Sequence, residues 1–460
     1  METLNIILIV IVVLLVGIGC FLAYSVAASR LSLANTIQQQ AIAGDNAAAV
    51  PATLVNYVEA IPLTWSSSVY TAAFTVGVSP VTAVLDSGSA EFVVAMQGCA
   101  SCTDSTYNPT ASSTAVLLID PRLAALANIT SLDPKQLAQY STILCRQTTS
   151  YVSQSDSIQM YQDVVTFPRR TLHTPDLCPG SGSGSGSPAG SVSLASSSTK
   201  PTDALVITNF PVGAVYAVTG SSNLNGLGMS AVLATTKIQV NGQTVFLMPS
   251  CQTIAVPAHE SPVISALAMH YGDTADLIWS MYLYPGEGGG WLVFGPMVIP
   301  CRVPAYVNMV QQLPNAAPGI SATPMRYYVV AVARMYIRHA HGGTTVLSDA
   351  PSLLLVDTGT TLTMLPGEAG VQTILNMDPV LDSLVLVLGD STSTVTLRYS
   401  GATLGVGTDD PKVTILPPAT AAAFSSALDV GILGCTWMRN MYLEFNVTKL
   451  KFGFGAPLVL

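Results

Sequence analysis

Short runs of apolar and β-branched residues recur along the chain, separated by turn-forming Gly, Pro, Asn and Ser. Runs of this length and spacing are typical of strands, so the pattern predicts an all-β protein. The segments predicted as strands are 72–78, 81–85, 157–167, 204–208, 237–247, 291–294, 327–337, 353–356, 383–388, 394–399 and 449–454. Helical periodicity is confined to residues 132–140, 262–270 and 418–427.

The N-terminal segment departs from this pattern. Residues 6–24 contain no charge, and the chain stays apolar or small to Ala28, which is long enough to cross a bilayer core as a helix. We therefore predict a transmembrane anchor in residues 1–28, followed by an Ala- and Gln-rich juxtamembrane linker over 29–53. A cleaved signal peptide is the alternative, since small residues follow the apolar run.

The composition narrows the class of protein further. The chain has 460 residues, of which 50% are hydrophobic and only 9% are charged, with a formal net charge of −9. So few charges do not suit a helical bundle or a coiled coil, and the apolar content excludes a disordered chain. The acidic balance excludes a basic nucleic-acid-binding surface, and no nucleic-acid partner is predicted.

Eight cysteines suggest an oxidising compartment. One of them, Cys20, lies in the apolar N-terminal run, and six of the other seven could form three bridges. The pair Cys99 and Cys102 could be half of a zinc site, a bridge or two free thiols, but the chain has no second pair at this spacing. We predict no metal and no cofactor. Two glycosylation sequons, at Asn128 and Asn446, suit a lumenal or extracellular body, and the protein is predicted to be a glycoprotein.

A short motif occurs twice, each time directly after an apolar strand. The first copy reads Asp86-Ser87-Gly88-Ser89 and the second Asp357-Thr358-Gly359-Thr360. Glycine permits a tight turn that brings backbone N–H groups to a carboxylate, and the hydroxyls can fix the loop by hydrogen bonds. Two such copies suggest two similar lobes that each contribute one carboxylate to a shared cleft.

Five landmarks around these copies resemble the pepsin-like aspartic proteases, in the order of that family and over about residues 54–457. They are the strand pair 70–78 and 81–89, the stretch 107–114, the flap hairpin with Tyr151 and Asp163, the strands 279–283 and 290–295, and the C-terminal signature 432–454. The resemblance implies a bilobal fold with a central cleft, an N-terminal lobe over 54–298 and a C-terminal lobe over 299–460.

The resemblance also implies a function, that of an aspartic endopeptidase. Asp86 and Asp357 would be the catalytic pair, and Tyr151 the flap tyrosine. Supporting roles would fall to Ser87, Gly88, Ser89, Thr358, Gly359 and Thr360. The substrate would be a peptide or protein bound in an extended conformation beneath the flap, and the enzyme would be a monomer.

Several positions depart from the family pattern. Val152 follows the flap tyrosine where the family usually has Gly, Val93 stands in place of a Trp, and Cys435 stands where the family often has Asp. The family also has two apolar residues followed by Gly in each lobe, a segment that we call the glycine lock. In the first lobe it reads as Leu224-Asn225-Gly226, with a polar residue inside it. A catalytically inactive pepsin-fold protein that serves as a surface or virion binding component is therefore the alternative.

The predicted location combines these observations. Residues 6–28 would tether the protein as a single-pass membrane protein, with the body on the lumenal or extracellular side or on a virion envelope. If the N-terminal segment is cleaved, the protein would be secreted.

Overall fold

The structure is a computed structural model. It describes residues 57–89, 92–99, 101–102, 106–118, 146–150, 154–178, 200–201, 204–220, 225–230, 236–240, 243–247, 253–254, 263–264, 267, 276–284, 288–297, 299, 304–310, 312–313, 323–324, 327–367, 381–389, 394–400, 412–416, 429–439 and 441–455. The predicted membrane segment, the linker and Tyr151 lie outside these residues. Within them, no helix is long and apolar enough to cross a membrane.

The first sheet is large and closes on itself. Its strands before residue 230 are β1 (Tyr57–Ser66), β2 (Val69–Val76), β3 (Ser79–Asp86), β4 (Phe92–Met96), β5 (Thr106–Tyr107), β6 (Val116–Leu117), β7 (Arg146–Ser150), β8 (Gln154–Phe167), β9 (Arg170–His173), β10 (Lys200–Pro201), β11 (Leu205–Gly220) and β12 (Gly226–Gly228). Its later strands are β16 (Ile278–Leu283), β17 (Gly290–Val293), β18 (Ala305–Asn308), β29 (Tyr442–Asn446) and β30 (Lys451–Gly455).

The second sheet has eight strands, in the order β26-β25-β21-β23-β28-β24-β27, with β22 paired to β21. These strands are β21 (Val329–His339), β22 (Thr344–Ser348), β23 (Ser352–Val356), β24 (Thr363–Leu365), β25 (Leu381–Gly389), β26 (Thr394–Ser400), β27 (Val413–Ile415) and β28 (Asp429–Leu433). Smaller sheets are formed by β13 (Thr236–Val240), β14 (Gln243–Leu247) and β15 (Thr253–Ile254), and by β19 (Gln312–Leu313) and β20 (Thr323–Pro324).

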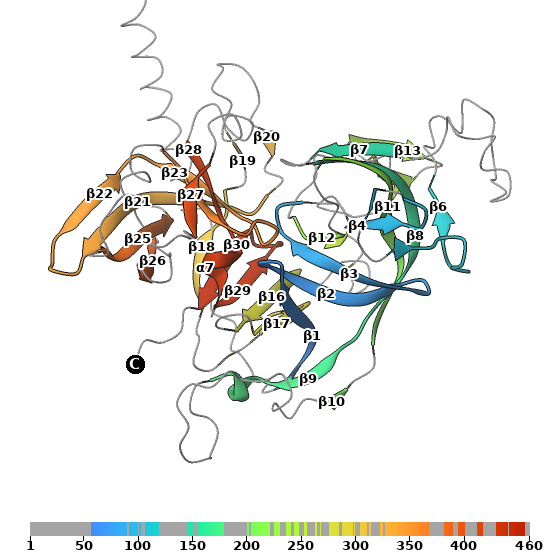
Figure 1. Ribbon diagram of the computed structural model, residues 1–460, viewed down its shortest axis with the longest axis horizontal. Coiled ribbons are helices and arrows are strands. Elements are labelled where there is room, and N and C mark those ends of the chain that lie inside the picture. Colours follow the sequence, from blue (N-terminus) through green and yellow to red (C-terminus); the bar gives the residue numbers. More distant parts are fainter. Residues whose placement is uncertain are drawn as a thin grey trace, which may run out of the picture.

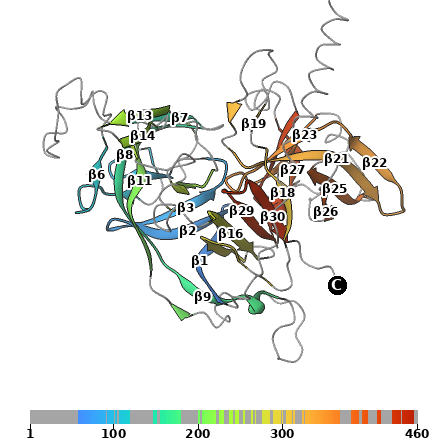
Figure 2. The ribbon, with the colours of Figure 1, turned by 180° about the vertical axis from the view of Figure 1, so that it is seen from behind.

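The two large sheets lie side by side, and β16, β29 and β30 of the first sheet lie in the middle of the molecule, towards the second sheet (Figure 1). The view from behind shows the same arrangement (Figure 2). Since β16 pairs with β29 and β18 pairs with β30, the first sheet takes strands from both sides of the lobe boundary at 298/299. That boundary stays a prediction, as do the other segment limits.

One apolar core joins the two halves. It contains Leu85 from β3 and Leu386 from β25, and aromatic rings fill its middle. The Trp279 ring stacks on Phe445 with centroids 3.8 Å apart, and the Trp279 indole N–H donates to the Tyr328 hydroxyl at 2.9 Å. The buried indole therefore keeps a hydrogen-bond partner while its ring packs between the sheets.

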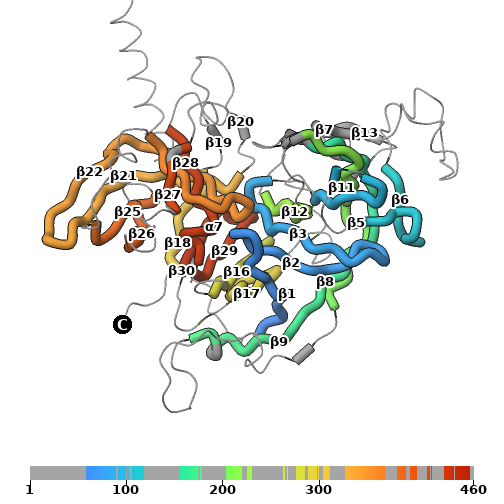
Figure 3. The backbone as a smooth tube through the Cα atoms, in the orientation of Figure 1, coloured from blue at the N-terminus to red at the C-terminus, as the bar shows by residue number. Residues whose placement is uncertain are grey.

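Each aspartate follows a strand that is held on a parallel neighbour. In the first half, β12 lies beside β3 (Figure 3). It runs parallel to β3, with Leu227 opposite Leu85. In the second half, β28 runs parallel to β23, with Leu433 opposite Val356. All residues of β23 are buried, as expected for a strand covered on both faces.

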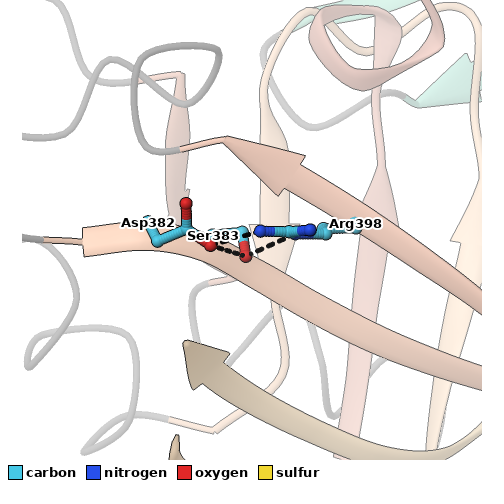
Figure 4. A network of polar contacts seen from close by, with 3 residues as sticks. All are labelled: Asp382, Ser383 and Arg398. Atoms are coloured by element: carbon cyan, nitrogen blue, oxygen red, sulfur yellow. Dashed lines mark hydrogen bonds and ion pairs between the residues drawn. The ribbon is translucent and has the colours of Figure 1, made fainter. Parts of the chain in front are cut away.

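The far edge of the second sheet is polar. Arg398 on β26 donates from Nε to the Ser383 hydroxyl at 2.9 Å and forms an ion pair with Asp382, both on β25 (Figure 4). The Arg398 partnership lowers the pKa of the Asp382 carboxyl. A charged and hydrogen-bonded edge of this kind discourages pairing with another chain.

Candidate active site

Asp86 ends β3, which brings it out of the core at the end of a buried apolar strand. The chain turns at once, and the Gly88 backbone N–H donates to Asp86 Oδ1 at 2.8 Å. The Ser89 hydroxyl also hydrogen bonds to the Asp86 carboxylate. A side chain at position 88 is excluded, because a Cβ there would lie 2.6 Å from the carboxyl carbon of Asp357.

Asp357 follows β23 and is built in the same way. Its Oδ1 accepts the Gly359 backbone N–H at 2.8 Å, and its Oδ2 accepts the Thr360 hydroxyl at 2.6 Å. A Cβ at position 359 would lie 2.5 Å from Asp86 Oδ1, so this position also requires glycine. Each turn glycine therefore faces the opposite aspartate.

The two loops hold each other through the hydroxyl residue after each aspartate. The Ser87 N–H donates to the Thr358 hydroxyl and the Thr358 N–H donates to the Ser87 hydroxyl, both at 2.9 Å. Each hydroxyl then donates across to the other strand, Ser87 to the Val356 carbonyl at 2.8 Å and Thr358 to the Leu85 carbonyl at 2.6 Å. Because both residues are fully buried, these four bonds fix the two loops as a pair.

The carboxyl groups of Asp86 and Asp357 face each other across the two turns, since a Cβ on either turn glycine would meet the opposite carboxyl group. Asp357 is buried and Asp86 is half-buried. Loss of hydration and the neighbouring Asp357 charge both raise the pKa of Asp86. Two carboxylates this close cannot both ionise cheaply, so the pair favours a state that shares one proton. We call this pair the dyad.

The glycine lock of the first lobe lies two residues beyond its predicted place. Gly228, not Gly226, stands opposite Asp86, and the Met229 N–H donates to the Asp86 carbonyl at 2.7 Å. The sequence interpretation was wrong because a shift of two residues leaves the alternation of a strand unchanged. Asn225 precedes the lock and is buried, where it accepts the Ala95 N–H at 2.7 Å and donates to the Thr82 carbonyl at 3.1 Å. The polar residue thus joins β3 to β4.

Asp163 lies on β8 and is also buried. Its carboxylate accepts hydrogen bonds from the Tyr107 hydroxyl at 2.8 Å, the Ser112 hydroxyl at 3.0 Å, the Thr114 hydroxyl at 2.5 Å and the Val164 N–H at 2.8 Å. The stretch 107–114 therefore serves to hold this carboxylate. A Cβ at Gly77, whose φ is +56°, would clash with both Ser112 and Asp163, so the β2–β3 turn packs directly against the cluster.

The structure describes only part of the predicted flap and its surroundings. Tyr151 lies outside the described residues, but Val93, which stands in place of a Trp, is buried on β4. It packs with Ile158, Met160 and Val215. This position therefore offers apolar contacts and no N–H donor.

The cysteines give one defined bridge. Cys99 and Cys102 form a disulfide, which decides between the alternatives for this pair, and Cys178 is disulfide-bonded as well. Cys435 is free and buried. Among the described residues no group of three or more His, Cys, Asp or Glu could hold a metal ion.

The sequon residue Asn446 is buried and accepts the Lys449 N–H at 2.8 Å, while Asn128 lies outside the described part of the chain.

Comparison with solved structures finds a similar architecture in an aspartic proteinase from Irpex lacteus. Its crystal structure matches with a TM-score of 0.53 and 16% sequence identity, over 87% of this chain and 98% of that chain. The fold is like that of an aspartic proteinase. No family model and no curated protein sequence matches the chain. At this identity the similarity concerns the fold alone, which is mostly β with two β-rich sheets.

Proposed function

We propose that the protein is an aspartic endopeptidase in which Asp86 and Asp357 are the catalytic pair. The observation that carries the proposal is the facing arrangement of the two carboxyl groups on two linked turns. Each turn glycine lies so close to the opposite carboxyl group that a side chain there would clash with it. The fold likeness to an aspartic proteinase supports the same reading.

The chemistry needs one base and one acid around a single water molecule. The ionised aspartate takes a proton from the water, whose oxygen attacks the carbonyl carbon of the peptide bond. The protonated aspartate donates its hydrogen bond to the carbonyl oxygen, where negative charge develops. The raised pKa of Asp86 keeps one proton on the pair at acidic pH, which suits both roles at once.

The surroundings of the dyad support preorganisation. Ser87 and Thr358 fix the two loops, and Ser89 and Thr360 hold one oxygen each of Asp86 and Asp357. An extended peptide would lie across the pair and be hydrogen bonded through its backbone, with Tyr151 over it. We include in the proposal the monomeric state, the membrane tether of residues 6–28 and the lumenal or extracellular body.

A second candidate function is binding without catalysis. It is favoured by Val93, which has no N–H donor with which to hold a flap tyrosine. In that case the dyad would remain as a structural pair, and an extended peptide would be held without being cleaved.

The experiment that separates the two is cleavage of a casein-like substrate between pH 3 and 6, with and without a statine-type inhibitor. Endopeptidase activity predicts acid-optimal cleavage that the inhibitor abolishes. Cleavage that the inhibitor leaves unchanged, or no cleavage at all, would contradict the proposal and favour the binding protein. The Asp357→Asn variant, prepared in the same way, is the control for contaminating proteases.

A further inference from the structure

The disulfide between Cys99 and Cys102 closes a very short loop after β4, because the two cysteines are only three positions apart. A bridge stabilises a fold less when the loop that it closes is short. The turn is also held without the bridge, since the Cys99 N–H donates to the Met96 carbonyl at 3.0 Å and the Cys102 N–H donates to the Cys99 carbonyl at 3.3 Å. Opening this bond is therefore compatible with the folded state.

Cys102 packs against a small apolar cluster that is separate from the main core. The cluster consists of buried aliphatic side chains on β4, β8 and β11, namely Val93, Ile158, Met160 and Val215. We call it the Val93 cluster. Because β8 begins at Gln154, just after the predicted flap tyrosine Tyr151, the cluster connects the disulfide to the strand that leads away from the flap.

The disulfide is accessible from one side. Cys99 is only 8% exposed, whereas Cys102 is half-buried and the neighbouring Ser101 is exposed. The Ser101 hydroxyl accepts the Val218 N–H at 3.2 Å, which holds the loop on β11. Disulfides that solvent can reach exchange with external thiols more readily than buried ones. Cys102 is thus the sulfur that an incoming thiolate would meet.

We propose that the Cys99–Cys102 disulfide is a thiol–disulfide exchange site for a dithiol, and that its reduction weakens substrate binding by loosening the Val93 cluster. A thiolate of the dithiol attacks the Cys102 sulfur, the S–S bond breaks, and its electron pair goes to the Cys99 sulfur, which takes up a proton. The second thiol of the dithiol then displaces Cys102 from the mixed disulfide. The dithiol is oxidised to a disulfide, and the protein gains two thiols.

The effect on substrate rests on the proposed protease function. Two thiol sulfurs cannot remain at bonding distance, so the Cys102 side chain moves on the Val93 cluster when the bond opens. Val93 has no N–H donor with which to hold a flap tyrosine, so β8 depends on apolar packing at this point. The dyad loops are held separately, by the hydrogen bonds between Ser87 and Thr358. Reduction should therefore change the KM more than the kcat.

The first test is thiol labelling of the folded native protein. It is treated briefly with dithiothreitol at neutral pH, alkylated with iodoacetamide and digested for mass spectrometry. We expect Cys99 and Cys102 to be alkylated while Cys435, which is free and buried, stays unmodified and so reports that the fold is intact. A pair that is not labelled, or that is labelled only together with Cys435, would overturn the inference.

The second test is the kinetics of cleavage of a casein-like substrate. Reduction should raise the KM about fourfold, as for the loss of about one buried methylene group, and should leave the kcat within about twofold. The double variant Cys99→Ser with Cys102→Ser should have the raised KM without any reductant and should not respond to dithiothreitol. A response that persists in this variant would come from another bridge and would contradict the assignment. Ser101→Ala keeps the disulfide, and as the control it should respond as the native protein does.

Amide hydrogen exchange gives a measurement that does not depend on cleavage. After reduction, residues 157–160 of β8 should exchange faster, whereas β23 should be unchanged. If the native protein cleaves but neither the KM nor the exchange in β8 responds, the inference is overturned and the protease function stands. If it does not cleave at any pH, the function fails, and labelling and exchange alone decide the inference. Unchanged exchange in β8 would overturn it in either case.

Discussion

The Asp163 site and the dyad both combine aspartate with Ser and Thr hydroxyls, but the two sites are built in opposite ways. Asp163 accepts hydrogen bonds from three hydroxyls and one backbone N–H, and no second carboxylate shares them. Asp86 instead faces a second carboxyl group, that of Asp357, whose charge raises the pKa of Asp86. Hydrogen-bond donors thus surround Asp163, whereas a second carboxyl group of like charge faces Asp86.

This difference separates a structural carboxylate from a reactive one. A buried carboxylate that accepts hydrogen bonds from several fixed donors holds the surrounding segments together. A carboxylate beside another carboxylate must share a proton with it, and that proton is available to a substrate. In the sequence, the two sites differ through the motif that follows the aspartate. The Asp-hydroxyl-Gly motif occurs at both aspartates of the dyad, whereas Asp163 is followed by Val164.

The largest effect on stability is expected at Asp163. Asp163→Ala would leave the buried hydroxyls of Tyr107 and Ser112 without their acceptor, which should lower the free energy of unfolding by about 3–4 kcal/mol. Tyr107→Phe, which removes one donor and leaves the acceptor satisfied, should cost about half as much. Urea unfolding measures both. Equal losses for the two variants would show that the carboxylate is not the centre of the cluster.

A smaller effect with the opposite sign is expected at Asp86. A carboxyl group with a raised pKa contributes stability below its unfolded pKa of about 3.9 and loses it as the pH rises through the folded pKa. Asp86→Asn removes this dependence. The melting temperature of the variant should therefore exceed that of the native protein by at least about 2 °C at pH 7, with the gap closing towards pH 3.

The pH dependence is the decisive part of that measurement. Thermal unfolding from pH 3 to 8 should show the native protein losing stability relative to Asp86→Asn as the pH rises. A difference in melting temperature between the two proteins that stays constant with pH would contradict this. It would mean that the asparagine acts through packing and that the native carboxyl group is not forced to hold a proton.

The smallest effect is expected at the exposed ion pair on the sheet edge. Arg398→Gln should change the melting temperature by only about 1 °C at pH 7, because solvent screens exposed charges. The lowered pKa of Asp382 means that its contribution is present above the unfolded pKa and is lost as the pH falls through the folded pKa. The small difference should thus vanish in acid. A change of several degrees at pH 7 would show that this edge is packed and not merely paired.

Much of the fold could be predicted from the sequence because strands of period two leave a clear pattern. The segments 81–85 and 353–356 fall within β3 and β23, and each is followed by the Asp-hydroxyl-Gly motif that forms the turn. The mutual contact of the two turns depends on strands far apart in the chain. It could be expected only because the motif occurs twice.

Other features left weaker signals. The pattern over 237–247 predicts one strand, but this segment contains the paired strands β13 and β14. The Asn241-Gly242 pair in the sequence is a hairpin signal within it. The helix α7 (Cys435–Met438) is too short to show a helical period. The role of Asn225 could not be predicted, because its two partners belong to strands whose pairing is set by the whole sheet.

The central claim is tested most directly by the cleavage rates of Asp86→Asn, Asp357→Asn and the double variant at the acid optimum. If the two aspartates act on one water molecule, each single variant should abolish cleavage and the double variant should be no slower than either single one. The native rate should follow a bell-shaped pH profile on the acid side of neutrality, since the singly protonated dyad is the working form. A single variant that keeps appreciable activity, or losses that multiply in the double variant, would contradict the account.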